Sequence, residues 1–251
     1  MSKDPGSQEA RGVTKSSGLS PARLLPIVVL VAGAVSFFAL DLDQYVTFEA
    51  LREHHDALKQ FVADNPIAAP LVYMAIYAVA VALSLPGGAI LSITGGFLFG
   101  SIYGTTLVVV AATLGAIIIF LAAKTALGDM LRAKAGPWMQ KMSDGFQENA
   151  LSYMLFLRLI PLFPFFVVNL VPAFLGVGLG VYALGTFIGI IPGAFVFVTV
   201  GAGLGSIFAS GEEFSVAGIL TPEIITALVG LAVLSLLPIL YKKYKARQNA
   251  P

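Results

Sequence analysis

The stretch LRLIPLFPFFVVNLVPAFLG, residues 157–176, places one arginine, one asparagine and three prolines in an otherwise apolar segment. Arg158 is the only charged residue between Glu148 and Glu212. Proline lacks the N–H that a helix interior uses, so the segment cannot cross a bilayer as one straight helix. The rest of the sequence has to explain why a cation lies beside a broken apolar segment.

The composition is that of an integral membrane protein. Hydrophobic residues make up 57% of the 251 residues and charged residues only 12%, whereas a soluble domain carries about 25% charged residues. The mean hydropathy is +0.88. The net charge of +1 gives no electrostatic basis for nucleic-acid binding, and the lack of cysteine excludes disulfides and thiolate metal sites. We expect an all-α membrane fold.

The chain divides into a membrane domain and two polar tails. Residues 1–22 are polar and rich in glycine and serine, which predicts a disordered cytoplasmic tail. Residues 23–240 form the predicted membrane domain, and 241–251 form a basic cytoplasmic tail. Spans are predicted at each end of this domain, near 24–40 and 224–240. A cleaved signal peptide is the alternative for the first of them.

The distribution of lysine and arginine limits the topology. These residues cluster in both tails and in the connector 124–149, whereas 41–65, a predicted amphipathic surface helix, has two and 210–223 has none. Basic loops stay in the cytoplasm, so the first three segments are predicted inside and the other two outside. The apolar blocks 66–123 and 150–209 must then each cross the membrane an odd number of times.

The lengths of the two blocks favour inverted repeats. Each block has about 60 residues and one crossing uses about 20, so one span plus a re-entrant helical hairpin fits each block. The broken segments 85–100 and 158–176 occupy corresponding places, and a shift of 76 residues superposes Gly100 on Gly176. Backbone that is broken at membrane depth is tolerated only beside protein or water. We therefore expect the two segments to meet and form a polar pocket.

Arg158 is the main candidate for binding a ligand. A charge inside the membrane costs at least about 2.5–3.5 kcal/mol, which disfavours an accidental one. A guanidinium binds phosphate through two parallel hydrogen bonds. The alternative is an interfacial arginine that extends to lipid headgroups or caps the end of a helix.

The other candidates lie in the two breaks, where prolines and glycines free backbone carbonyls to contact a headgroup. The predicted substrate-binding residues are Arg158, Pro161, Pro164, Asn169, Pro86, Gly87, Gly96 and Gly100.

The ladder Gly185, Gly189 and Gly193, which Gly201 and Gly205 extend, is assigned to helix packing, because such spacing lets helix backbones approach closely. It permits a homo-oligomer without requiring one.

Several other activities lack support in the sequence. Neither apolar block contains an aspartate or glutamate, which argues against a proton relay inside the membrane. His54 and His55 lie near acidic residues, but adjacent positions face different sides of a helix, so a solvated surface is favoured over a metal site. No catalytic or nucleotide-binding motif is present. We expect no enzyme activity, no cofactor and no metal.

The motifs resemble those of the SNARE-associated Golgi protein family, or VTT-domain proteins, of the DedA superfamily. The resemblance covers residues 60–210 and rests on LPGGAILSITGGFLFGSIYG (85–104), ATLGA (112–116), FLAAK (120–124) and RLIPLFPFFVVNLVPAFLGV (158–177). It implies two facing re-entrant helices in inverted repeats and a role in moving lipids across the bilayer. The acidic residues of the branch linked to proton-driven transport are missing from residues 86–100.

The resulting functional hypothesis is a flippase or scramblase of a phospholipid or polyprenyl-phosphate carrier, in which Arg158 binds the phosphate. Membrane lipids are its predicted partners. A secondary transporter of a small anion or other solute is the first alternative, and a non-transporting membrane organiser is the second. The short loops predict a multi-pass protein of a bacterial inner (plasma) membrane, with both termini in the cytoplasm.

Overall fold

The computed structural model describes residues 21–134, 146, 148–160, 163–210, 222–237, 239–241 and 244. Every regular element in these ranges is a helix, which confirms the predicted all-α fold. Nearly all of the predicted tail 1–22 and most of 241–251 lie outside the described residues.

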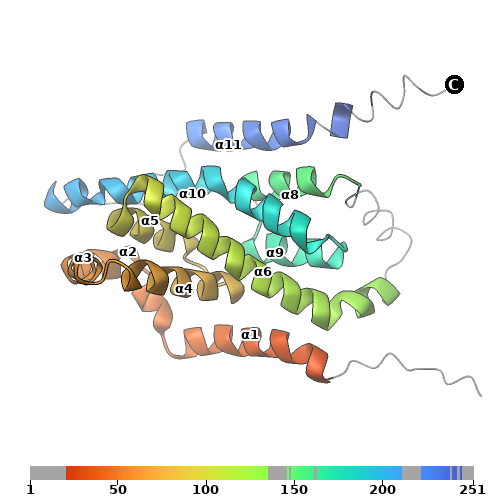
Figure 1. The fold of residues 1–251 in the computed structure, drawn as a ribbon, viewed down its shortest axis with the longest axis horizontal. Helices are drawn as coiled ribbons and strands as arrows, with labels where there is room; N and C mark the ends of the chain where they lie inside the picture. The colour runs from red at the N-terminus through yellow and green to blue at the C-terminus, as the bar shows by residue number, and fades with distance from the viewer. Residues whose placement is uncertain are drawn as a thin grey trace, which may run out of the picture.

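Figure 1 shows the helices as an elongated bundle, with α1 and α11 on opposite outer sides. In chain order the elements are α1 (Pro21–Ala39), the 3-10 helix η1 (Leu42–Tyr45), α2 (Phe48–Glu53), α3 (His55–Asp64), α4 (Ala68–Ala82), α5 (Gly88–Phe99), α6 (Ser101–Lys134), α8 (Ala150–Leu159), α9 (Phe165–Phe174), α10 (Leu179–Ser210) and α11 (Pro222–Ser235).

The predicted amphipathic helix over 41–65 is divided into η1, α2 and α3. The side chain of Thr47 accepts a hydrogen bond from the amide of Ala50 and so begins α2. His54 separates α2 from α3. Lys59 Nζ lies 4.5 Å from the centroid of the Phe97 ring, and this contact links α3 to α5.

Each apolar block folds as two short helices followed by a long one. In the first block α4 and α5 precede α6, which has 34 residues. In the second block α8 and α9 precede α10, which has 32 residues. The polar residues after Ala123 do not end α6, which continues to Lys134, because lysine, arginine and leucine favour helix.

The packing of the two blocks is reciprocal. Within each block the first helix packs on the long one, α4 on α6 and α8 on α10. Across the blocks, α5 packs on α10, α9 packs on α6, and the two long helices contact each other. Gly100 and Gly176 both adopt left-handed backbone, with φ of 75° and 76°. The inverted repeats and re-entrant hairpins themselves remain predictions.

Two helices in the described part of the chain are long and apolar enough to cross a membrane, Ser101–Ala126 and Leu179–Leu204. By contrast α5 has 12 residues and α9 has 10. At 1.5 Å per residue these lengths are about 18 and 15 Å, well below the hydrocarbon thickness of about 30 Å. The predicted flanking spans contain only shorter apolar helices, Leu24–Ala39 and Ala232–Tyr241.

Glycines allow the close crossing of α5 and α10. A Cβ at Gly96 would overlap the carbonyl of Val198, and a Cβ at Gly201 would overlap the carbonyl of Ile93. Gly185 and Gly189 likewise lie against Met154 and Arg158 of α8. The predicted packing role is confirmed for Gly185, Gly189 and Gly201.

The substitution Gly96→Ala is expected to destabilise the protein by about 2 kcal/mol or more, because the new methyl group must displace backbone rather than a flexible side chain. The melting temperature of the purified protein measures this effect. The matched control is Gly180→Ala, since a Cβ at Gly180 meets nothing within 4 Å. Equal melting temperatures for the two variants would contradict the proposed crossing.

Candidate functional site

The first break separates α4 from α5. Pro86 has no amide hydrogen and disfavours helical backbone at the residue before it. Ser84 has a φ of 53° and Gly87 a φ of 107°, so the chain turns sharply here. A left-handed serine is uncommon, which marks this turn as strained.

The second break separates α8 from α9. The backbone becomes extended at Ile160, and Pro164, with a φ of −55° and ψ of 139°, precedes the first turn of α9. The predicted ligand Pro161 lies outside the described residues. The stretch 157–176 therefore contains the end of α8 and all of α9 as two separate helices.

The two breaks border the same cavity, which has a volume of about 390 Å³. Pro86 and Gly87 line it from the first break, and Arg158 and Phe165 line it from the second. The remaining lining is mostly apolar. Among the described residues of its lining, Tyr77, Ser92 and Arg158 have polar side chains and none is acidic.

Arg158 lies in the last turn of α8 and contacts both other helices of its block. Its Nη1 donates a hydrogen bond of 2.9 Å to Oδ1 of Asn169 in α9. Its Nη2 donates to two hydroxyl groups of α10, that of Tyr182 at 3.1 Å and that of Thr186 at 2.9 Å. The tyrosine hydroxyl in turn lies 3.3 Å from Asn169 Oδ1, to which it donates.

These partners are neutral and leave part of the guanidinium unused. A guanidinium has five N–H donors, of which these three bonds occupy three. Arg158 Nε and Asn169 Nδ2 are both buried, and neither has a hydrogen-bond partner. Within the described ranges no carboxylate forms an ion pair with Arg158. The site therefore combines a cation that has no anionic partner among the described residues with two donor nitrogens, Arg158 Nε and Asn169 Nδ2, that have no hydrogen-bond partner.

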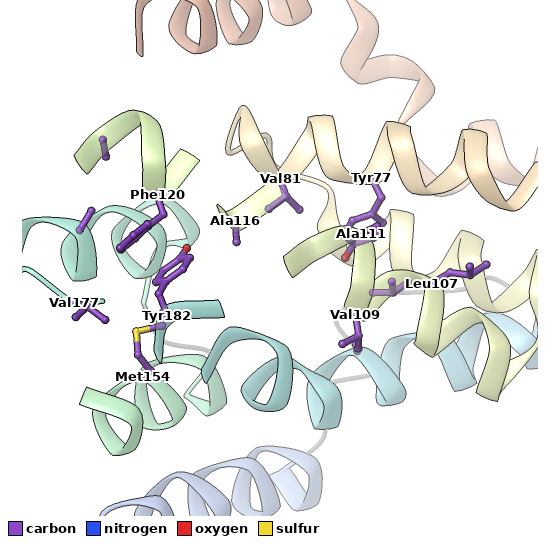
Figure 2. Packing of buried hydrophobic residues seen from close by; sticks show 14 of the residues in the cluster. Tyr77, Val81, Leu107, Val109, Ala111, Ala116, Phe120, Met154, Val177 and Tyr182 are labelled. Atoms are coloured by element: carbon purple, nitrogen blue, oxygen red, sulfur yellow. The ribbon is translucent and has the colours of Figure 1, made fainter. Parts of the chain in front are cut away.

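A pair of stacked rings supports this cation. The rings of Phe120 and Tyr182 lie 4.1 Å apart at 21° to each other (Figure 2). Arg158 Cζ lies 5.6 Å from the centre of the tyrosine ring. Lys124 Nζ lies 5.4 Å from that of the phenylalanine. Lys124 also donates to the carbonyl of Val177 at 3.3 Å, so it ties α6 to the turn before α10.

Tyr182, Thr186, Phe120 and Lys124 were not among the substrate-binding residues predicted from the sequence. One signal could have found two of them. Tyr182 and Thr186 are four residues apart in an apolar, glycine-rich segment, which places both on one helix face.

The opposite side of the cavity is held by tyrosines of α4. The hydroxyl of Tyr73 donates to the carbonyl of Leu91 at 2.8 Å. The hydroxyl of Tyr77 lies 3.0 Å from Ser92 Oγ, which itself donates to the carbonyl of Gly88 at 2.7 Å. These bonds fix the first turns of α5 against α4.

The predicted site residues thus fall into separate groups. Arg158, Pro86 and Gly87 line the cavity, and Asn169 contacts the guanidinium without lining it. Three others lie away from the cavity lining: Pro164 before α9, Gly96 against the carbonyl of Val198, and Gly100 at the turn before α6. Ligand binding by these residues remains a prediction.

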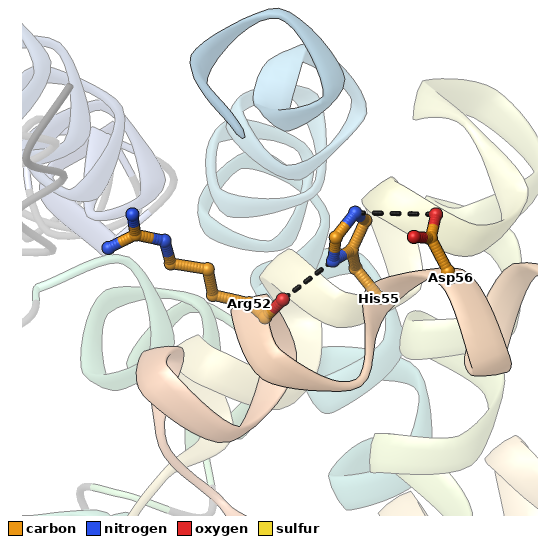
Figure 3. A network of polar contacts seen from close by, with 3 residues as sticks. All are labelled: Arg52, His55 and Asp56. Atoms are coloured by element: carbon orange, nitrogen blue, oxygen red, sulfur yellow. Dashed lines mark hydrogen bonds and ion pairs between the residues drawn. The ribbon is translucent and has the colours of Figure 1, made fainter. Parts of the chain in front are cut away.

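The histidine pair has a local structural role. His55 Nδ1 lies 2.6 Å from the carbonyl oxygen of Arg52, and its Nε2 lies 3.3 Å from Oδ1 of Asp56 (Figure 3). No group of three or more histidine, cysteine, aspartate or glutamate residues in the described part of the chain could hold a metal ion.

A known domain family matches the part of the chain that contains α5 and most of α10. The VTT domain matches residues 85–203, a range that begins at the first break and ends within α10. The chain contains a VTT domain. The matched range includes Pro86, Arg158 and the hydrogen-bond partners of Arg158, whereas Tyr73 and Tyr77 of α4 precede it.

The curated relatives of this VTT-domain protein are transmembrane proteins of eukaryotes. It is 33% identical over 199 residues to Transmembrane protein 41 homolog of Dictyostelium discoideum. This alignment covers 78% of the chain and 58% of that relative. It is 31% identical over 177 residues to Transmembrane protein 41B of Danio rerio (69% of the chain, 60% of the relative) and of Homo sapiens (69% and 58%).

The chain spans about three fifths of the length of the relatives that it matches. No solved structure matches it significantly. These relatives indicate a membrane protein. The bacterial inner membrane and the cytoplasmic termini remain predictions.

The substitution Tyr182→Phe is expected to lower the stability by about 1–3 kcal/mol, because it leaves one buried donor of Arg158 without its acceptor. Thermal unfolding in detergent measures the loss. Tyr103→Phe is the matched control, since Tyr103 is 52% exposed. If both variants unfold at the wild-type temperature, the hydroxyl does not hold the guanidinium.

Proposed function

We propose that this VTT-domain protein moves lipids with an anionic phosphate headgroup across the bilayer, as a flippase or scramblase of phospholipid or polyprenyl-phosphate carrier. The phosphate enters the cavity between the two breaks and binds Arg158. The observation that carries the proposal is Arg158, a residue that lines the cavity. Its guanidinium lacks a carboxylate partner in the described residues, and its buried Nε donor has no hydrogen-bond partner.

The charge of Arg158 favours an anion over a neutral ligand. A cation held only by neutral acceptors at membrane depth has not regained the stabilisation it loses by leaving water. A phosphate oxygen is a strong charged acceptor. It can accept hydrogen bonds from the guanidinium N–H groups that do not donate to Asn169, Tyr182 or Thr186. Binding then neutralises the charge without breaking the bonds that position the side chain.

The lengths of α5 and α9 suit a path for lipid headgroups. Each helix is too short to span the hydrocarbon layer, so we assign both to re-entrant hairpins that face each other from opposite leaflets. The reciprocal packing of α5 on α10 and of α9 on α6 supports two inverted repeats. A cavity between two such hairpins would be reached from either side in turn.

The cavity chemistry favours movement down a gradient. None of the described residues that line the cavity is acidic, so they offer no carboxylate to carry a proton with the substrate. We therefore propose facilitated lipid exchange with neither proton coupling nor enzyme activity.

We propose that the protein resides in a bacterial inner (plasma) membrane with both termini in the cytoplasm. The basic residues cluster in the two tails and in the connector 124–149, the distribution that holds segments inside.

Reconstitution into liposomes tests the proposed function. Fluorescent phosphatidylglycerol is distributed over both leaflets, and reduction of the outer-leaflet label reports its movement. Wild-type protein is expected to expose the inner-leaflet label. Arg158→Gln is expected to slow this exposure about tenfold or more, since a hydrogen bond to a charged group contributes about 1.5–3 kcal/mol. Arg52→Gln, which changes an exposed arginine of α2, serves as the control and is expected to match wild type.

Two further measurements separate a binding role from a structural one. Arg158→Lys keeps the charge but loses the planar fork, so an intermediate rate is expected for a phosphate ligand. Melting temperatures show whether each variant remains folded. Equal rates for wild type and a folded Arg158→Gln variant would overturn the role of Arg158. Uptake of free phosphate without lipid movement would instead establish a small-anion transporter.

A further inference from the structure

A second cavity, of about 430 Å³, lies between α1, η1 and α4. Gly33 and Phe37 line it from α1, and Ala75 and Val79 line it from α4. Ser36 is the only residue with a polar side chain among the described residues of its lining. This cavity therefore suits hydrocarbon and offers nothing to bind a charged group.

The apolar cavity and the Arg158 cavity share a wall. Four residues line both of them: Ala80, Leu85, Pro86 and Leu91. Leu85 and Pro86 of this wall belong to the first break, and Ala80 of α4 and Leu91 of α5 lie on either side of it. A cationic compartment and an apolar compartment are thus separated by a single turn of chain.

We propose that the apolar cavity binds a hydrocarbon chain of the same anionic lipid whose phosphate binds Arg158. This inference rests on the proposed function and adds a chain site to it. A phosphate and its hydrocarbon chain are joined covalently, so a ligand that fills both cavities must pass the Pro86 turn. A small inorganic anion could occupy only the first cavity.

The strained turn fits this placement. Ser84 has left-handed backbone, and its hydroxyl is buried without a hydrogen-bond partner. A Cβ at Gly33 would meet Leu83 Cδ2 at 2.9 Å, so α1 approaches the same turn closely. The chain site therefore lies where α1 faces the first break.

Alkyl phosphates of increasing length test the chain site. Inorganic phosphate, butyl phosphate and octyl phosphate are titrated into the full-length protein in nanodiscs of neutral lipid. Each methylene that leaves water improves affinity by up to about fourfold. Wild-type protein is expected to bind octyl phosphate at least about tenfold more tightly than butyl phosphate, after subtraction of binding to empty nanodiscs.

Filling the apolar cavity should remove this gain. Ala75→Phe adds a ring from α4, at an exposed position that lines only this cavity. We expect the variant to bind butyl and octyl phosphate with equal affinity while its affinity for inorganic phosphate is unchanged. Ser36→Phe fills the cavity from α1 and is expected to do the same. The control is Ala68→Phe, on the same helix but outside both linings.

The chain site and the phosphate site can fail independently. A chain-length gain that persists in both folded filling variants overturns the chain site, whatever Arg158→Gln does. Loss of the gain in the filling variants but not in Ala68→Phe supports it. If Arg158→Gln binds inorganic phosphate as wild type does, the phosphate site fails, and the chain-length readout still decides the chain site.

Discussion

The guanidinium of Arg158 links three helices, α8, α9 and α10, by hydrogen bonds. It leaves the last turn of α8 and donates to Asn169 of α9 and to Tyr182 and Thr186 of α10. Because each acceptor is neutral, the charge is positioned without being neutralised. A carboxylate in the same place would have formed a closed ion pair, whereas this arrangement keeps the cation available to an anion.

The two breaks bring this cation to a cavity, and glycines bring the breaks together. Pro86 and Gly87 interrupt the first block, and the backbone at Ile160 interrupts the second. The close crossing of α5 and α10 at Gly96 and Gly201 sets the distance between the two blocks. The Tyr182 ring, which stacks on Phe120, lies 5.6 Å from Arg158 Cζ and so helps to position the guanidinium.

Part of this arrangement could be predicted from the sequence. Prolines and glycines act on their own backbone, so the breaks near Pro86 and Pro164 were predictable, and a lone charge identified Arg158. Its partners were not, because Tyr182 lies 24 residues away and the pairing depends on which helix faces meet. The packing of Gly96 against the carbonyl of Val198 was not predictable either, because it depends on which helix crosses α5 at that residue.

The most direct test of the central claim is a structure of the protein with bound decyl phosphate. The account predicts the phosphate group within hydrogen-bond distance of Arg158 Nε, with the bonds to Asn169, Tyr182 and Thr186 retained and the alkyl chain beside Pro86. A phosphate bound elsewhere, with the Arg158 cavity empty, would contradict it.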